Sequence, residues 1–443
     1  MNSQQAAIAS IRFGMGARPG ELARRQSDPR GSLLAELDSP DNLSGLFDTQ
    51  PTAASMMGRF MRERQRGGDG AIIRLFRKDF RKTYIEEAAL RTEAAVLSRT
   101  PFHERLVHFW SNHFTVSARR PILAGLAGAY EREAIRSNLG GRFEDLLISV
   151  VKHPAMILYL DNALSIGPNS ELGERRERGM NENLAREILE LHTLGVNGGY
   201  VQDDVIALAR MLTGWSIARP NNSPRPGTFR FYARAHEPGT QMLLGRRYHA
   251  DGFAQAEQAL RDIAGHPSTI RHVSTKLVRH FTADDPAEAD IRSIVDVWTR
   301  TAGDLRAVHA ALTGLDSAWR PLTKLKTPND LLISSLRAIG HGKARPWVVG
   351  ALDLLGQAPW AAPSPKGWSD RASGWLGAAQ AMRRIEFASA WAERAPVRVE
   401  PRHVAASAFG PLMDTDTRIT IERAESREQG LAVALASPAF QRR

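Results

Sequence analysis

The chain has 443 residues, of which 42% are hydrophobic and 24% charged, as in a folded globular protein rather than a disordered or fibrous one. Because it contains no cysteine, disulfides, thiolate metal sites and cysteine nucleophiles are excluded. The formal net charge of +11 suits a partner of opposite sign, such as nucleic acid, anionic lipid or an acidic protein. An arginine-rich, solvated surface is the alternative explanation, and we favour it.

Helical periodicity dominates the chain. Apolar residues recur at spacings of three and four among strong helix formers, as an amphipathic helix requires. Gly195 and Gly214 each follow such a run, where a left-handed cap would end a helix. We predict helices at 84–97, 101–115, 143–160, 183–194, 204–212, 254–264, 270–281, 287–301, 304–314, 329–339, 346–355 and 375–393.

Two stretches interrupt this pattern. Residues 219–252 contain several prolines and an alternating segment, 228–233, which predicts a strand paired with 241–248. Residues 356–373 are dense in Pro and Trp and predict an ordered irregular loop, since tryptophans are seldom left in water. No linker separates domains, so we expect a large all-α protein forming one helical domain over 1–443, with a small β-hairpin excursion around 228–248.

No apolar run reaches the length of about 20 residues that a bilayer span needs. The best stretch, Pro121 to Tyr130, is about half that length and rich in Gly and Ala. The first residues also lack the basic and apolar regions of a secretory signal. We therefore expect a cytoplasmic protein, with export alongside a signal-bearing partner as the alternative.

The segment 181–196 carries the most informative polar pattern. On an ideal helix, Asn183, Glu187 and Glu190 fall within about 60° of one another. Two carboxylates on one face suit half a metal site or an acid–base pair. The alternative is a solvated face in which Arg186 pairs with Glu190. His192 lies about 200° from Glu190, so the Glu-x-x-His pattern of di-iron bundles is not formed.

Two histidines could complete a site built on those carboxylates. A helical His113 would lie among aromatic rings, where it is either a core residue or a general base or axial ligand whose pKa is lowered by burial. His236, in the irregular stretch, is the other candidate. We therefore take Glu187, Glu190 and His113 as catalytic candidates, and Asn183 and His236 as ligand-binding candidates.

Basic side chains suggest an anion site. His272, Lys276 and Arg279 form a ridge along one predicted helix, which suits a phosphate, sulfate or carboxylate. Lys324 and Lys326 precede another helix, whose N-terminus attracts anions. A solvated basic face is the alternative in both places.

Several well-known motifs are absent. The glycines around residues 14–20 follow no hydrophobic strand, so they do not form a dinucleotide loop. Gly342 and Lys343 could end a P-loop, but Arg337 stands where its first Gly is required. Neither a G-x-S-x-G elbow nor an H-E-x-x-H motif occurs. The sequence therefore indicates no particular metal or cofactor.

Six separated segments carry a recognisable pattern: FGMGARPGE (13–21), FWSNHFTVS (109–117), NENLAREILELHTLGVNGGY (181–200), LTGWS (212–216), LKTPNDLLISSLRAIG (325–340) and PSPKGW (363–368). Together, and in this order, they resemble the bacterial domain-of-unknown-function 1800 family. The resemblance implies a large, mainly helical bacterial protein, often encoded beside a member of the domain-of-unknown-function 1501 family, which is similar to sulfatases and alkaline phosphatases. The resemblance assigns no catalytic residue.

Three hypotheses follow. The first is an accessory or ligand-binding protein that acts with a partner, such as that sulfatase-like protein. The second is an enzyme with a metal or acid–base site on Glu187, Glu190 and a histidine. The third and weakest is nucleic-acid binding through the basic surface.

Overall fold

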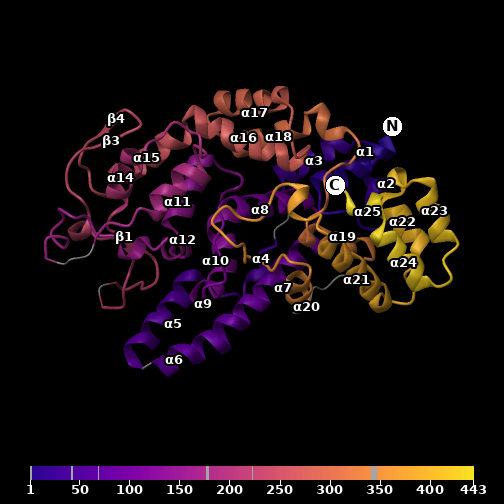
Figure 1. Cartoon of the computed structure of the whole chain (residues 1–443), viewed down its shortest axis with the longest axis horizontal. Helices are drawn as coiled ribbons and strands as arrows, with labels where there is room; N and C mark the ends of the chain where they lie inside the picture. The colour runs from indigo at the N-terminus through magenta and orange to yellow at the C-terminus, as the bar shows by residue number, and fades with distance from the viewer. Residues whose placement is uncertain (1, 41–42, 68, 176–178, 222, 341–346) are drawn as a thin grey trace.

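Figure 1 shows the computed structural model of the chain, which describes every residue except 1, 41–42, 68, 176–178, 222 and 341–346. Helices dominate, and the strands of the described residues form only two small antiparallel sheets, which confirms the predicted fold class. No described helix is both long and apolar enough to cross a bilayer. The prediction of a single domain stays a prediction.

The predicted helices occur within a few residues of their expected bounds, except that 143–160 is broken at His153, whose extended backbone is the conformation that a following proline requires. The first residue of the predicted 346–355 helix lies outside the described residues. The helices are α1 (Asn2–Ile8), α2 (Glu21–Arg25), α3 (Pro29–Asp38), α4 (Ser44–Phe47), α5 (Ala53–Arg66), α6 (Asp69–Arg74), α7 (Arg81–Leu97), α8 (Pro101–His113), α9 (Pro121–Ala124), α10 (Ala127–Tyr130), α11 (Phe143–Lys152), α12 (Pro154–Tyr159), α13 (Asn183–Glu187), α14 (Gln202–Leu212), α15 (Phe253–Ala264), α16 (Pro267–Phe281), α17 (Glu288–Thr301), α18 (Leu305–Thr313), α19 (Pro328–Ala338), α20 (Trp347–Leu354), α21 (Ala378–Arg394), α22 (Pro401–Phe409), α23 (Thr415–Glu422), α24 (Arg427–Ala436) and α25 (Pro438–Gln441).

The predicted strand pairing is wrong. Strand β2 (Phe229–Phe231) pairs with β1 (Trp215–Ile217), not with the segment 241–248. That segment folds back on itself as β3 (Gln241–Leu243) and β4 (Arg246–Tyr248). The two residues between β3 and β4, Leu244 and Gly245, both have positive φ, which is the geometry of a two-residue hairpin turn.

The interior contains two hydrophobic clusters. The larger one includes the buried faces of α8, α11 and α14–α18, and the smaller one joins α19–α25 to part of α7 and to Ile11 and Met15 near the N-terminus. In Figure 1 the smaller cluster occupies the right-hand end of an elongated molecule, and α5–α7 extend below the body on the left. Helices α7, α8 and α19 therefore lie where the two clusters meet.

Residues 356–375, named here the strap, cross this junction. Their only regular element is one 3-10 turn, Ala372–Gly374. The strap runs as an orange loop across the centre of Figure 1. Trp375 is buried, and Trp360 and Trp368 are half-buried against the body of the protein.

Arg337 ties the two parts of the chain together. This side chain of α19 is only 1% exposed. It donates to the carbonyl oxygens of Ala95 and Val96 at the end of α7, at 3.0 and 2.9 Å, and to the Glu21 carboxylate at 2.8 Å. One guanidinium therefore satisfies orphan carbonyls of one helix while it balances a buried charge.

Replacing Arg337 with Met should destabilise the fold by about 3 kcal/mol, because Glu21 and the α7 carbonyls lose a buried partner. The decrease in the free energy of unfolding is limited because Arg25 still pairs with Glu21. Urea unfolding measures the change. Arg394→Met on the exposed face of α21 is the control and should stay within about 0.5 kcal/mol of the parent. Equal stabilities of the two variants would contradict this role.

Candidate functional site

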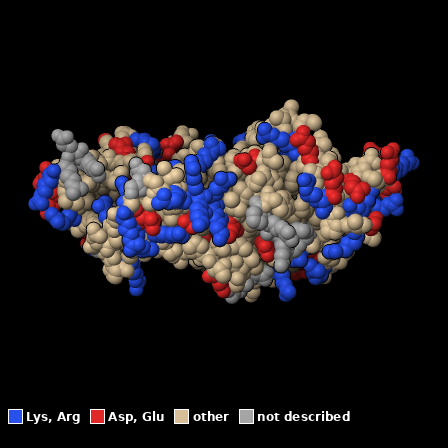
Figure 2. Space-filling view, turned by 90° about the horizontal axis from the view of Figure 1, so that it is seen from below, with Lys and Arg blue, Asp and Glu red and all other residues tan. Residues whose placement is uncertain are grey.

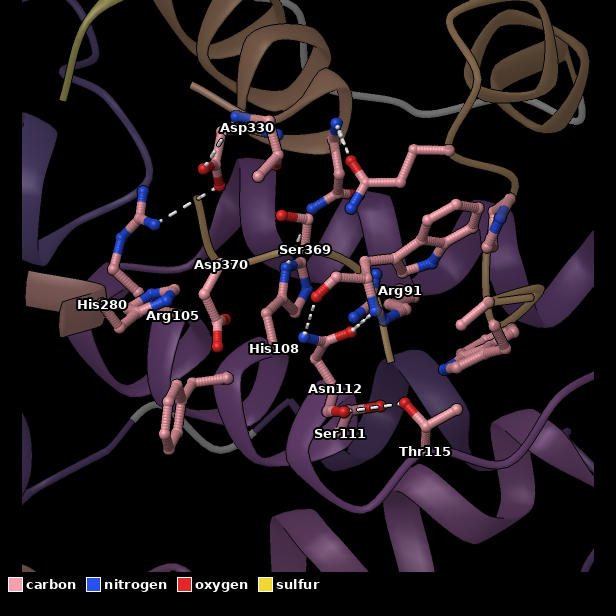
Figure 3. A pocket seen from close by; sticks show the side chains of 18 of the residues that line it. Arg91, Arg105, His108, Ser111, Asn112, Thr115, His280, Asp330, Ser369 and Asp370 are labelled. Carbon is pink, nitrogen blue, oxygen red and sulfur yellow. Dashed lines mark hydrogen bonds and ion pairs between the residues drawn. The ribbon is translucent and has the colours of Figure 1, made fainter. Parts of the chain in front are cut away.

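A pocket of about 90 Å³ lies under the strap, at the junction of the two hydrophobic clusters. Figure 3 shows side chains from α7, α8, α16, α19 and the strap converging on it. Its charged and polar lining is Arg91, Arg105, His108, Ser111, Asn112, Thr115, His280, Thr327, Asn329, Asp330, Gln357, Ser369, Asp370 and Arg443, and its aromatic lining is Phe109, Trp360 and Trp368.

His108 lines this pocket and carries an unused hydrogen-bonding atom. Its Nδ1 atom accepts a hydrogen bond from Asn329 Nδ2 at 3.1 Å, so the neutral ring carries its proton on Nε2. That Nε2 atom is buried and has no hydrogen-bond partner among the described residues. Burial and the charge of Arg91 lower the pKa of His108 to about 3, which keeps the ring neutral at pH 7.

Asp330 is the charged centre of the site. Its carboxylate lies 3.3 Å from Arg105 Nη1 and 3.0 Å from Arg443 Nε, and these two guanidiniums hold its pKa well below the usual range. The same residue completes the capping box of α19 with Thr327. One buried carboxylate thus positions α8, the start of α19 and Arg443 together.

Asn112 holds the strap through two hydrogen bonds. Its side-chain oxygen accepts from Trp368 N at 2.7 Å, and its side-chain nitrogen donates to Trp368 O at 3.1 Å. The neighbouring Gly367 has a φ of +82°, and a Cβ there would lie 2.4 Å from the Asn112 carbonyl oxygen. Only glycine fits this close approach, which explains why Gly367 stands in the PSPKGW segment where that segment contacts FWSNHF.

A second network closes the other end of the pocket. Glu131 pairs with Arg91 at 2.7 Å and accepts from Trp360 Nε1 at 2.9 Å. The guanidinium of Arg91 also lies 5.5 Å from the centre of the Trp360 ring. Tyr84 donates to the Pro359 carbonyl oxygen at 2.9 Å. These contacts fix the aromatic wall, so the pocket is preformed.

The family of the chain can now be stated. A family model described as a protein of unknown function, DUF1800, matches residues 8–442. The chain belongs to the DUF1800 family. No curated protein and no solved structure matches it.

Glu187 and Glu190 lie together, away from the strap pocket. Both are half-buried, and burial together with the charge of Glu190 raises the pKa of Glu187. The predicted pairing of Arg186 with Glu190 is wrong, since Arg186 bonds Glu182 at 2.8 Å. The helix becomes a π-helix at Ile188–His192, so the assumed rotation of 100° per residue does not hold there.

The other members of that predicted site lie apart. His113 is a buried ring beside Phe109, Trp110 and Phe114, and its Nε2 bonds the His192 carbonyl oxygen at 3.0 Å.

His236 bonds the Thr213 carbonyl oxygen at 3.0 Å, and Asn183 is exposed. No hydrogen bond or ion pair between described residues joins either His113 or His236 to Glu187 or Glu190. The described residues also hold no group of three or more His, Asp or Glu arranged for a metal ion. An acid–base role for Glu187 and Glu190 stays a prediction.

The predicted basic ridge on α16 is real but partly covered. His272 and Lys276 are half-buried, and burial lowers the pKa of both, that of His272 to about 4. The charge of Asp370 in the strap acts on Lys276, and Arg279 donates to the Asp284 carbonyl oxygen at 3.0 Å. This ridge therefore runs from His272 toward the pocket residue His280.

Lys324 and Lys326 are interior cations. Lys324 bonds Asp284 and the Asp370 carbonyl oxygen, while Lys326 bonds Ser334 at 3.0 Å. Burial lowers the pKa of Lys324 to about 8 and that of Lys326 to about 7. A solvated basic face, the alternative weighed for this segment, does not describe them.

Sequence reasoning missed the residues that form the pocket. His108, Asn112 and Asp330 all lie in or beside the segments that carry the family resemblance, but each is ordinary in isolation. Two features of the sequence could have drawn attention to the site. One is the capping box of Thr327 and Asp330, and the other is Gly367 in PSPKGW. Neither feature indicates the residue that it contacts from another part of the chain, which is Arg105 for Asp330 and Asn112 for Gly367.

Acid should unfold this protein at mild pH. Eight histidine rings have pKa values lowered by burial, six of them strongly, so the folded state binds fewer protons than the unfolded state, whose histidines titrate near 6.5. The free energy of unfolding is therefore highest above about pH 6.5. It falls as the pH is lowered, by about 1.4 kcal/mol per pH unit for each strongly shifted ring. The six strongly shifted rings are His108, His113, His192, His272, His280 and His309.

Thermal unfolding between pH 7 and pH 4.5 measures this effect. His192→Phe is the sharpest variant, because neither ring nitrogen of His192 has a partner and its pKa is about 3. The variant should lose one histidine's share of the pH dependence, whereas His403→Gln on the exposed surface should not. An unchanged pH dependence in His192→Phe would show that this ring does not resist protonation.

Proposed function

We propose that this protein binds a small acidic molecule, of the carboxylate class, in the pocket beneath the strap. The observation that carries the proposal is a pocket lined by arginines and by His108, a neutral ring whose buried Nε2 has no partner among the described residues. A preformed pocket with converging polar groups and perturbed pKa values is the usual sign of a ligand site.

The charge balance around Asp330 favours an anion. Three guanidiniums, all at most 6% exposed, interact with this single carboxylate: those of Arg105, Arg443 and Arg384. Lys326, whose pKa is about 7, interacts with it as well. Burial lowers the pKa of Arg105 to about 10 even beside Asp330, so the carboxylate only partly offsets the cost of burying these charges. An anionic ligand would supply the missing negative charge.

The hydrogen-bonding groups favour an oxygen acceptor. The Nε2–H of neutral His108 is a donor, and a guanidinium binds carboxylate oxygens well. The cavity of about 90 Å³ is small beside the roughly 300–1,000 Å³ of pockets for drug-sized ligands, so the ligand has few heavy atoms. Short carboxylic acids fit both requirements.

The expected partner stays a prediction. The sulfatase-like protein of the domain-of-unknown-function 1501 family comes only from the resemblance, and co-purification from the native host tests it. Cytoplasmic localisation and nucleic-acid binding also stay predictions.

Thermal unfolding in sodium acetate or glycolate, against sodium chloride at equal ionic strength, tests the ligand proposal. The acids should raise the melting temperature, because binding to the folded state stabilises it. His108→Phe removes the donor and should weaken binding about tenfold or more, the cost of a hydrogen bond to a charged group. His309→Phe, a buried ring that does not line the pocket, is the matched control and should bind like the parent.

The proposal fails if neither acid stabilises the protein more than chloride does, or if both histidine variants respond alike. Native mass spectrometry of the purified chain provides a second readout, which should show a small bound acid in the parent and not in His108→Phe.

A further inference from the structure

The positive charge of the chain is concentrated in one place. Residues 59–82 contain nine Lys and Arg against three Asp and Glu, which is a net charge of +6 out of +11 for the whole chain. They span the end of α5, α6, the π-helix Leu75–Phe80 and the first turn of α7, named here the basic hairpin. Residue 68 lies outside the described residues.

All nine cations of the basic hairpin are exposed, and most have no bonded partner. Arg59 pairs with Asp79 at 2.9 Å and Lys82 with Glu86 at 3.7 Å. The remaining cations have no ion pair among the described residues. Figure 2, seen from below, shows blue side chains gathered left of centre, over the region where Figure 1 places α5 and α6. The exposed cations are Arg59, Arg62, Arg64, Arg66, Arg74, Arg77, Lys78, Arg81 and Lys82.

The two arms of the basic hairpin pack against each other. The Phe60 and Phe76 rings stack at 5.8 Å between its two arms. Five of its cations lie exposed along the second arm: Arg74, Arg77, Lys78, Arg81 and Lys82. Exposed cations spread over a packed hairpin suit a broad anionic surface better than a small anion.

Apolar groups accompany these charges. Ile73 on α6 is 49% exposed beside Arg74. An open, mainly apolar groove of about 590 Å³ also begins at α5, where Phe60, Met61 and Leu164 line it together with Arg64. Cations beside exposed aliphatic side chains are the pattern of segments that lie in a membrane interface.

We infer that the basic hairpin docks onto an anionic lipid surface, with its Lys and Arg among the headgroups and Ile73 at the acyl boundary. Nucleic acid is the less suitable occupant. No aromatic ring is among the large apolar side chains exposed in the described part of the chain, so a stacking platform for bases is missing. A lipid surface accounts for both the cations and the exposed isoleucine.

Vesicle co-sedimentation of the full chain tests the inference. The protein should bind phosphatidylcholine vesicles that contain phosphatidylglycerol, should not bind pure phosphatidylcholine, and should release as salt is raised. The double variant Arg74→Glu with Lys78→Glu should bind at least about tenfold more weakly. Ile73→Ser should bind several-fold more weakly while its salt dependence is retained.

The matched control is Arg292→Glu with Arg300→Glu, which makes the same change in net charge on exposed positions of α17, at the opposite edge of the molecule in Figure 1. This variant should bind charged vesicles nearly as well as the parent. If both double variants lost vesicle binding equally, net charge alone would account for the effect, and the inference would be overturned. Failure to bind phosphatidylglycerol vesicles would also overturn it, as would retention of duplex DNA by the parent without vesicle binding.

Discussion

The buried carboxylate of Asp330 is the constraint on which the junction of the two hydrophobic clusters depends. Arg105 and Arg443 approach it from different parts of the chain, and Thr327 shares a capping box with it. A carboxylate out of water needs such partners, but each partner also loses its own hydration. The guanidiniums of Arg105, Arg443 and Arg384 outnumber this one carboxylate. Replacing such a buried ionic cluster with well-packed apolar side chains is often neutral or stabilising, so the cluster is weak evidence of a purely structural role.

The strap covers part of this junction and forms one wall of the pocket. Asn112 bonds both backbone polar groups of Trp368, and Gly367 permits the approach, so this irregular segment is fixed to α8. The pocket beneath it therefore exists without a ligand, and binding would need little reorganisation. The basic hairpin is built differently, since its charges project into water and meet no buried partner.

The sequence predicted the helices well and the site poorly. Helices depend on residues that are close in sequence, whereas the site depends on contacts between residues that are far apart in sequence. Helical periodicity and capping are local, so α16 and α19 could be located to within a few residues. The pairing of β2 depended on a partner outside the predicted hairpin and was missed. His108 and Asn329 are 221 residues apart, and nothing local in either segment indicates that contact. Paired carboxylates such as Glu187 and Glu190 attract notice because they are close in sequence.

The most direct test of the account is nitrogen NMR of the His108 ring in the full chain, with and without sodium acetate. The account predicts a neutral ring at pH 7 with its proton on Nε2, whose resonance moves when acetate is added while that of His309 stays in place. A ring protonated at pH 7, or a His108 resonance that acetate leaves unchanged, would contradict the claim that this pocket is a preformed site for a small acid.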